Sequence, residues 1–362
     1  MTFAKKIDIL KKLMDTELLI QRSNIISSLR EFFSQNNFLE VDTPALSPTL
    51  IPETCLEVFK TFYHKPDYQN HPIENDFSTE SENIEELYLV PSPEVYIKPL
   101  IAKHKISVFQ ISKCYRNVES VGRTHSPEFT MLEYYKLGAN YMDSLELTEN
   151  LFYFLDKKFN LPQDLTPPFI KLSMNDAFFN HAGFYLSDCQ DVKSLAQKAR
   201  SLELFEPTDN PFENWTWEEL YNLIFVQIVE PNLPKEKGVF LLDYPKAVPC
   251  LAQDVKNSEK NQNLPCKERW ELYCRGIELA NCYSEETEAQ NIKEYFEEEG
   301  NLKNKSALVP HAMNEDYWKF FSETDGNSGF PKCSGTAMGV DRLIVLLCGK
   351  NSIDDVLHFP LK

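Results

Sequence analysis

The stretch CYRNVESVGRTHSPEFTMLEYY, residues 114–135, has the pattern of a strand, a charged loop and a returning strand. Side chains alternate along a strand, so Phe129, Glu133 and Tyr135 share one face of the returning strand. The guanidinium of Arg116 can hold a phosphate group with two hydrogen bonds, and the ring of Phe129 can stack on a base. An ordinary solvated hairpin explains this stretch equally well when it is taken alone, so the rest of the sequence has to decide.

The composition indicates a folded, acidic protein. Of the 362 residues, 42% are hydrophobic and 12% are aromatic, which is enough for a packed core and argues against global disorder. The formal net charge is −18. Because so negative a surface repels phosphate backbones, we expect a basic protein or a cationic small molecule as the partner, and no stable nucleic-acid complex.

Nine cysteines are scattered along the chain, and no two of them have Cys-x-x-Cys spacing. This pattern favours reduced thiols in a cytoplasmic protein over a disulfide framework or a zinc ribbon. We also expect no membrane span, because no run approaches the roughly 20 apolar residues that one requires. The isolated histidines make a histidine-built metal site improbable.

The first half of the chain begins with hydrophobic residues at helical spacing from Leu18 to Phe33, and residues 38–44 follow as a short extended segment. Residues 64–86 are acidic and polar with almost no aliphatic side chains, and we interpret them as a mobile surface insertion.

The second half has a mainly helical pattern over residues 141–230. Strand-like runs follow at 238–243 and 270–280, and the acidic stretch 285–300 is expected to be a solvated helix. The closing segment SGTAMGVDR, residues 334–342, predicts a tight junction between a strand and a helix, where glycine lets a ligand approach the backbone. We expect one domain over residues 1–362.

Four separated pieces resemble the catalytic core of the class II aminoacyl-tRNA synthetases. In chain order they are similar to motif 1, motif 2, the amino-acid-binding strand and motif 3 of that core: FLEVDTP (38–44) with the helix before it, the stretch 114–135, GIELANCYSE (276–285) and GTAMGVDRL (335–343). The resemblance spans nearly the whole chain. It implies an α+β fold, with an antiparallel sheet flanked by helices, and a symmetric homodimer built on motif 1.

Within this class the chain resembles the lysyl-tRNA synthetases most, because HSPEFTMLE (125–133) is close to their form of motif 2. Motif 1 begins almost at the N-terminus, so we expect no anticodon-binding domain and no stable binding of tRNA. A stand-alone core with IELAN (277–281) and an alanine at Ala337 is similar to the elongation factor P lysine ligases. That similarity implies ATP-dependent activation of lysine, preferably (R)-β-lysine, and its transfer to a lysine of elongation factor P.

The resemblance also implies which residues bind ATP. Arg116 matches the arginine that bridges the substrate carboxylate and the α-phosphate. Arg342 matches the arginine that holds the γ-phosphate side and lies over the adenine, so both are expected to be catalytic. Phe129 would cover the other face of the base. The remaining expected nucleotide contacts are Asn117, Glu119, His125, Ser126, Glu278, Leu279 and Gly339.

Two carboxylates, Glu278 and Glu285, lie seven residues apart on one segment, and we expect them to hold Mg²⁺ beside the triphosphate. This hard cation prefers oxygen ligands and bridges phosphates. Glu285 has an alternative or additional role as the partner of a substrate ammonium group, because a buried carboxylate selects lysine over neutral amino acids.

The lysine site is implied in the same way. Glu94 matches the second carboxylate that binds an amine, Tyr135 would bond the distal amine, and Asn281 would bond the carboxylate. The complete expected set comprises Ser92, Pro93, Glu94, Arg116, Tyr135, Asn281, Glu285 and Ala337.

Two positions depart from the family pattern. Val118 stands where the family has a glutamate that contacts the adenine amine, in a loop that is one residue longer, and Glu119 could restore the contact through a shifted turn. Ser126 replaces an asparagine.

Two other functions stay open: lysylation of a tRNA or another small acceptor, and binding of lysine or a partner without catalysis. An enzyme is favoured by the intact Arg116, Glu278, Glu285 and Arg342.

Overall fold

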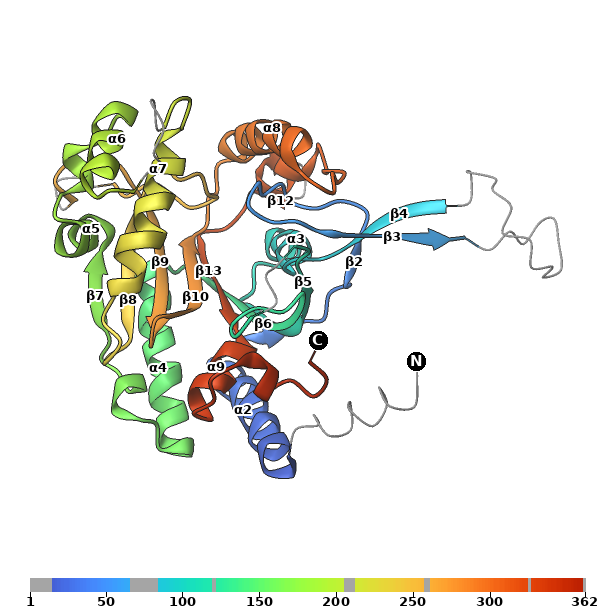
Figure 1. The fold of residues 1–362 in the computed structure, drawn as a ribbon. Coiled ribbons are helices and arrows are strands. Elements are labelled where there is room, and N and C mark those ends of the chain that lie inside the picture. The colour runs from blue at the N-terminus through green and yellow to red at the C-terminus, as the bar shows by residue number, and fades with distance from the viewer. Residues whose placement is uncertain are drawn as a thin grey trace, which may run out of the picture.

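A large, mostly antiparallel sheet organises the molecule (Figure 1). The computed structural model describes residues 15–65, 84–118, 122–204, 212–256, 261–324 and 327–360. Eight strands form the sheet in the order β1-β5-β6-β13-β10-β9-β8-β7, and only the outer pairs β1/β5 and β7/β8 are parallel. The strands are β1 (Leu39–Glu40), β5 (Val108–Tyr115), β6 (Glu128–Leu137), β7 (Ile170–Ser173), β8 (Val239–Pro245), β9 (Cys266–Cys274), β10 (Ile277–Ser284) and β13 (Cys333–Gly339).

Three helices cover one face of this sheet: α2 (Thr16–Gln35), α4 (Tyr141–Phe159) and α9 (Val340–Leu347). Their apolar side chains meet alternate residues of the strands, such as Leu132 and Tyr134 of β6, in the largest core cluster. Both long helices start at side-chain caps, where Asp15 accepts from the amide of Leu18 and Asn140 forms a capping box with Asp143.

A buried ion pair fastens this layer. The guanidinium of Arg22 in α2 lies 2.7 Å from the carboxylate of Asp341 in α9, which also accepts from the amide of Thr130 at 2.6 Å. Arg22 donates in addition to the carbonyl of Val356 at 3.1 Å. Three distant segments thus meet at the Asp341 carboxylate, and Arg22 joins the segment of Val356 to them.

The other face carries two separate groups of elements. Helices α5 (Met174–Ala182), α6 (Val192–Ser201) and α7 (Trp217–Ile224) pack over β8 and β9 in a second core cluster. Helices α3 (Glu94–His104) and α8 (Ala289–Ser306) form a third cluster beside β5 and β6. In Figure 1 the two groups stand over opposite ends of the sheet. A stretch of sheet between them is left for the site.

A three-stranded sheet in the order β2-β4-β3 lies next to α3. Its strands are β2 (Leu46–Ser47), β3 (Phe59–His64) and β4 (Ile84–Leu89). The edges of the insertion predicted over 64–86 lie in strands, where His64 pairs with Ile84, and Glu85 and Glu86 pair with Tyr63 and Phe62. Pairing between residues about 20 positions apart leaves no local signal in the sequence. Residues 66–83 lie outside the described ones.

The short elements complete the description. A hairpin joins β11 (Glu323–Thr324) and β12 (Asn327–Ser328), and Phe225–Val229 forms one π-helical turn after α7. Turns of 3₁₀ helix lie at Gln163–Leu165, Leu186–Asp188, Glu230–Asn232, Tyr317–Phe321 and Ile353–Asp355.

Most of the predicted organisation is confirmed. The fold is α+β with a flanked antiparallel sheet, and residues 141–230 are mainly helical apart from β7. The expectation of a solvated helix over 285–300 is wrong at its start, because Glu285 and Glu286 are buried and α8 begins only at Ala289.

All nine cysteines are free of disulfides. Among the described residues, no helix has both the length and the apolar character needed to cross a membrane.

Candidate active site

The exposed stretch of sheet is the floor of a cavity of about 490 Å³. Strand register places two rows of side chains there, because residues two apart on a strand point to the same face. The first row consists of Glu133, Ala337, Asn281 and Glu271, and the second consists of Tyr135, Gly335, Tyr283 and Arg269. All eight residues line the cavity.

The middle strand of the floor, β13, carries only small residues on this face. A Cβ atom at Gly335 would lie 2.1 Å from Oε1 of Glu285 and 2.5 Å from the ring of Tyr135, so only glycine fits there. The predicted role of this glycine segment was to let a ligand approach the backbone. At Gly335, however, the groups that approach the backbone are protein side chains.

A buried cation organises one end of the cavity. Lys98 of α3 is 1% exposed and pairs with Glu94 on its own helix and with Glu285 at 2.8 Å. Burial opposes the charge, but Glu285 and Glu94 hold the pKa of Lys98 well above its usual range. Two carboxylates predicted to bind a substrate amine are thus already bridged by an internal ammonium group, which sequence reasoning did not anticipate.

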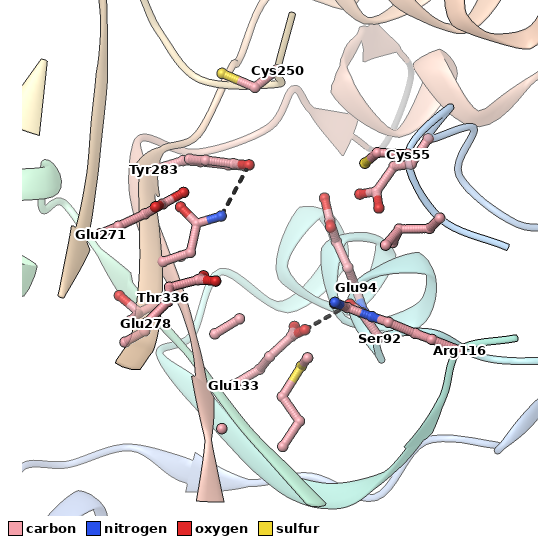
Figure 2. Close-up of a pocket in the computed structure, with 18 of the residues that line it drawn as sticks. Cys55, Ser92, Glu94, Arg116, Glu133, Cys250, Glu271, Glu278, Tyr283 and Thr336 are labelled. Carbon is pink, nitrogen blue, oxygen red and sulfur yellow. Dashed lines mark hydrogen bonds between the residues drawn. The ribbon is translucent and has the colours of Figure 1, made fainter. Parts of the chain in front are cut away.

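Glu133 is a further carboxylate at this end, and it was not among the predicted site residues. It accepts from the hydroxyl of Ser92 at 2.6 Å, shown as a dashed line in Figure 2, and from the hydroxyl of Tyr135 at 3.2 Å. Burial and the charge of Glu94 raise the pKa of Glu133 to about 8. The signal was present in the sequence, since Glu133 shares a strand face with Phe129 and Tyr135. We name Lys98, Glu94, Glu133 and Glu285 the acidic end.

The other predicted lysine-site residues differ in their position. Ser92 and Ala337 line the cavity, with Ala337 directly between Asn281 and Glu133 in the sheet. Pro93 is the N-cap of α3 and accepts backbone hydrogen bonds from the first turn, so it positions Glu94 and is not part of the cavity wall. Asn281 donates to Tyr283 at 3.3 Å, and its buried Oδ1 has no donor in the described part of the chain. A free acceptor suits a ligand N–H better than the carboxylate that was predicted.

Arg116 lies beside Glu94 and Ser92 in Figure 2, across the cavity from Glu278 and Glu271. Its guanidinium carbon lies 5.2 Å from the centre of the Phe129 ring. One face of that ring, predicted to cover the adenine, is thus occupied by the arginine. The buried Nε of Arg116 has no acceptor among the described residues. Buried donors are rarely left unpaired, so this group fits an anionic ligand such as a carboxylate or a phosphate.

Arg342 lies on the same side of the cavity as Glu278. It donates to the carbonyl of Glu278 at 2.7 Å and to the carbonyl of Thr124 at 3.1 Å, and it lies 3.6 Å from the Glu278 carboxylate. These bonds fix the guanidinium where β10, the motif 2 loop and α9 meet. We name Arg116 on one side of the cavity, together with Arg342 and Glu278 on the other, the phosphate end.

The metal pair Glu278 and Glu285 stays a prediction. Glu278 lies in β10, whereas Glu285 follows the last residue of that strand and pairs with Lys98. The carboxylate that acts on Glu278 is Glu271 of the neighbouring strand, and burial together with Glu271 raises the pKa of Glu278. Glu271 and Glu278 are therefore the carboxylates suited to a shared Mg²⁺.

The other predicted nucleotide contacts fall into three groups. His125, Ser126 and Gly339 line the cavity. Leu279 also lines it, but its side chain belongs to the core below the sheet, so only its backbone is available to a ligand. Asn117 does not line the cavity and instead donates to the carbonyl of Val58 at 3.2 Å.

The departure at position 118 remains in the structure. Val118 is 65% exposed with a φ of 59°, a backbone conformation that a β-branched residue rarely adopts. It therefore makes no buried contact of the kind expected of the missing glutamate. Glu119, the candidate to replace that contact, lies outside the described residues.

Comparison with known proteins gives one consistent result. The family model for class II tRNA synthetases (D, K and N) matches residues 4–362. The chain is 34% identical to the elongation factor P--(R)-beta-lysine ligase of Buchnera aphidicola subsp. Acyrthosiphon pisum (strain APS), over 95% of each chain. It is 31% identical to the ligase of the same name from Vibrio atlanticus (strain LGP32), over 94% of each. It is also 32% identical to the lysine--tRNA ligase of Carboxydothermus hydrogenoformans (strain ATCC BAA-161 / DSM 6008 / Z-2901), over 95% of this chain and 65% of that protein.

Proposed function

The chain belongs to the class II tRNA synthetases (D, K and N) and is an ATP-dependent ligase, and we propose that it activates (R)-β-lysine and transfers it to a lysine side chain of elongation factor P. The observation that carries this proposal is the acidic end, where Glu94, Glu133 and Glu285 surround one buried lysine. A pocket of three carboxylates suits a ligand with ammonium groups, and the arginines across the cavity suit its carboxylate and ATP.

In the first step, the carboxylate of the amino acid attacks the α-phosphate of ATP and pyrophosphate leaves. We propose that Arg116 contacts both reacting groups, because its unpaired Nε faces a site for an anion. Its positive charge offsets the repulsion between a carboxylate and a phosphate and stabilises the charge of the transition state. Arg342 would hold the far end of the triphosphate.

Magnesium is expected at Glu278 and Glu271. The repulsion that burial creates between these two carboxylates would be relieved by a divalent cation, and oxygen ligands suit Mg²⁺. When bound, the ion would neutralise phosphate charge. Glu285 is better suited to the amine, because it lies in the acidic end against Lys98.

The selection of the substrate follows from the charges of the acidic end. Lys98 balances one negative charge of Glu94 and Glu285, whereas Glu133 receives only neutral hydroxyl donors from Ser92 and Tyr135. We propose that Glu133 takes the distal ammonium group and that Asn281 accepts from the second amine. A neutral amino acid would leave these groups desolvated and unpaired.

A homodimer is proposed on the motif 1 elements. Ile20 of α2 and Leu39 of β1 are each 55% exposed, and Leu19 adds to this apolar strip. Apolar side chains on the elements that form the dimer in this class favour a symmetric contact. Sedimentation of the native chain and of Ile20→Asp would test it, with the variant expected to be monomeric.

The remaining proposals follow from the charge and from the relatives. We propose a cytoplasmic enzyme that acts as one catalytic unit and does not bind tRNA stably, since a net charge of −18 opposes a polyanion. The same charge favours association with a basic surface around the acceptor lysine.

ATP–pyrophosphate exchange, run with α-lysine and with (R)-β-lysine, tests the first step. We expect exchange with both and a higher kcat/KM for the β-isomer. Transfer of radiolabelled amino acid to elongation factor P tests the second step, with a factor lacking its acceptor lysine as the control. Absence of exchange with either isomer would contradict the proposal. Exchange with transfer only to tRNA would favour the alternative acceptor.

A further inference from the structure

The loop over residues 51–58 covers the cavity and is fixed from two sides. On one side, the amide of Thr54 donates to Glu299 of α8 at 3.3 Å, and Lys303 of α8 donates to the carbonyl of Leu56. On the other side, the amide of Asn117 donates to the carbonyl of Glu57 at 2.8 Å. Since Asn117 follows Arg116 directly, the loop is tied to the strand that carries the arginine of the phosphate end.

Glu53 opens this loop, and its half-buried side chain lines the cavity. The charged groups that act on its carboxylate are Glu94 and Lys98 of α3, Arg116 beside the loop and Lys303 of α8. Over the ranges that the structure describes, no donor lies within hydrogen-bond distance of this carboxylate. The loop is therefore held firmly, and the carboxylate it presents plays no part in holding it.

The transfer step needs such a group. An acceptor lysine has an ordinary pKa of about 10.4, so it arrives as an ammonium ion that cannot attack a carbonyl. A proton acceptor close to Arg116 must remove one proton before the nitrogen can react. The base must also be reachable from the mouth of the cavity, because the acceptor belongs to another protein.

Most other groups that line the cavity are unsuited to this role. Arg116 is permanently protonated. Burial raises the pKa of the Cys55 thiol to about 11 and shifts that of the Tyr283 hydroxyl above its usual range, so both remain protonated at neutral pH. The same cause raises the pKa of Tyr295.

Five other carboxylates of the cavity are engaged. Glu285 and Glu94 share Lys98, Glu133 accepts from Ser92 and Tyr135, and the carboxylates of β9 and β10 pair with arginines. All of them except Glu94 belong to strands of the floor or the segments that directly follow them, where the activated amino acid would lie between them and an incoming amine. Glu53 stands on the opposite side, in the roof.

We propose that Glu53 is the general base of the transfer step; this inference rests on the proposed activation and transfer of lysine. The acceptor ammonium gives one proton to the Glu53 carboxylate, and the freed nitrogen lone pair attacks the carbonyl carbon of the aminoacyl-adenylate. A C–N bond forms, and the bond from that carbon to the bridging phosphate oxygen breaks. AMP leaves with the electron pair, and the second nitrogen proton passes to water.

The acidity of Glu53 agrees with this role. Burial and the charge of Glu94 raise the pKa of the Glu53 carboxyl to about 7, whereas Arg116, Lys98 and Lys303 lower it. A base is most effective when its pKa lies near the working pH. The transfer rate should therefore rise with pH through about 7 more steeply than the exchange rate does.

Glu53→Gln keeps the shape of the side chain and removes the base. We expect single-turnover transfer from the preformed adenylate to elongation factor P to fall about 10²-fold, within the range typical of a lost general base. Exchange should fall by no more than a few-fold. Glu53→Asp should recover part of the transfer rate. Hydroxylamine is already unprotonated at neutral pH, so the variant should release the adenylate to hydroxylamine at the wild-type rate.

Glu218→Gln is the matched control, because Glu218 lines the same cavity from α7 and has no role in the proposed chemistry. It should leave both steps as in the wild type. Equal transfer by Glu53→Gln and wild type, with exchange intact in both, would overturn the role of Glu53 alone. Equal loss of transfer to the protein and to hydroxylamine would also overturn it, because a general base would spare the neutral amine. Absence of exchange in the wild type would instead overturn the proposed function.

Discussion

The two ends of the cavity are built differently. In the acidic end, each carboxylate already has a partner within the protein: Lys98 joins Glu94 to Glu285, and Ser92 and Tyr135 donate to Glu133. In the phosphate end, Arg342 and Glu278 bond to each other, but the Nε of Arg116 has no partner among the described residues. The carboxylates of the acidic end are therefore held by the folded protein, whereas the site around Arg116 is open to an anionic ligand.

Arg116→Ala should have the largest effect on activity. It removes the only group proposed to touch both the amino-acid carboxylate and the α-phosphate, and losses of about 10³-fold are typical when such a donor is deleted. Exchange kinetics should show a fall in kcat/KM of this size. The melting temperature should change little, because the buried Nε makes no bond whose loss would weaken the fold. A strongly lowered melting temperature would show that the two ends are not built differently.

Lys98→Met should have the largest effect on stability. Removing the cation leaves Glu94 and Glu285 buried without their partner, and breaking a buried ion pair costs about 3–5 kcal/mol. Chemical denaturation should show a lowered free energy of unfolding. Lys98→Met combined with Glu285→Gln should recover part of the loss, since one buried charge is then removed. A double variant as unstable as the single one would contradict this.

Glu133→Gln should lower activity and raise stability together. The pKa of Glu133 is about 8 in the folded protein against about 4.5 unfolded, so the folded state keeps a proton that the unfolded state loses. The contribution of Glu133 to stability therefore declines as the pH rises from about 4.5 to 8. The variant should melt at a higher temperature than wild type at pH 9 and at nearly the same temperature at pH 4.5.

The same variant should lose about 10²-fold in kcat/KM for lysine, because a charge-assisted hydrogen bond of roughly 2–3 kcal/mol is removed. Its KM for ATP should stay within a few-fold of the wild-type value. A variant less stable than wild type at pH 9 would contradict the proposal that the ionised Glu133 carboxylate destabilises the folded protein until a substrate cation binds to it.

Gly335→Ala should have the smallest of these effects. The new methyl group would lie 2.1 Å from the Glu285 carboxylate and must push it or Tyr135 aside, at a cost of about 1–3 kcal/mol. Because both neighbours belong to the amine side of the cavity, the KM for lysine should rise about tenfold while that for ATP changes less. An equal rise in both KM values would mean that the strand itself has moved.

The sequence was sufficient where function depends on a single residue in a recognisable motif. Arg116, Arg342, Glu94 and Tyr135 all line the cavity, and their roles in binding stay predictions. The fold class was also predictable, because strand and helix patterns are local. The alternation that places Tyr135 on the floor also places Glu133 there, so this residue was within reach of the same argument.

Sequence reasoning failed where two segments must be placed relative to each other. Glu278 and Glu285 are close in sequence, but burial and Glu271 act on Glu278, whereas Glu285 pairs with Lys98. The neighbour of Glu278 is Glu271, across a turn that reverses the chain. Glu53 lines the cavity, and Lys98 pairs with Glu94 and Glu285 behind its wall, from elements whose docking depends on the complete fold.

The buried contact between Arg22 and Asp341 has a consequence for the order of synthesis. It joins the first described helix to Thr130, which follows Phe129 of the hairpin, and to residues as late as Val356. Asp341 directly precedes Arg342, so the start of α9 is held in place by α2 and the last segment as well as by the bonds of Arg342 to Thr124 and Glu278. A growing chain on the ribosome holds its hairpin strands long before it can hold ATP. Binding of the nucleotide therefore reports that the whole chain has emerged and folded.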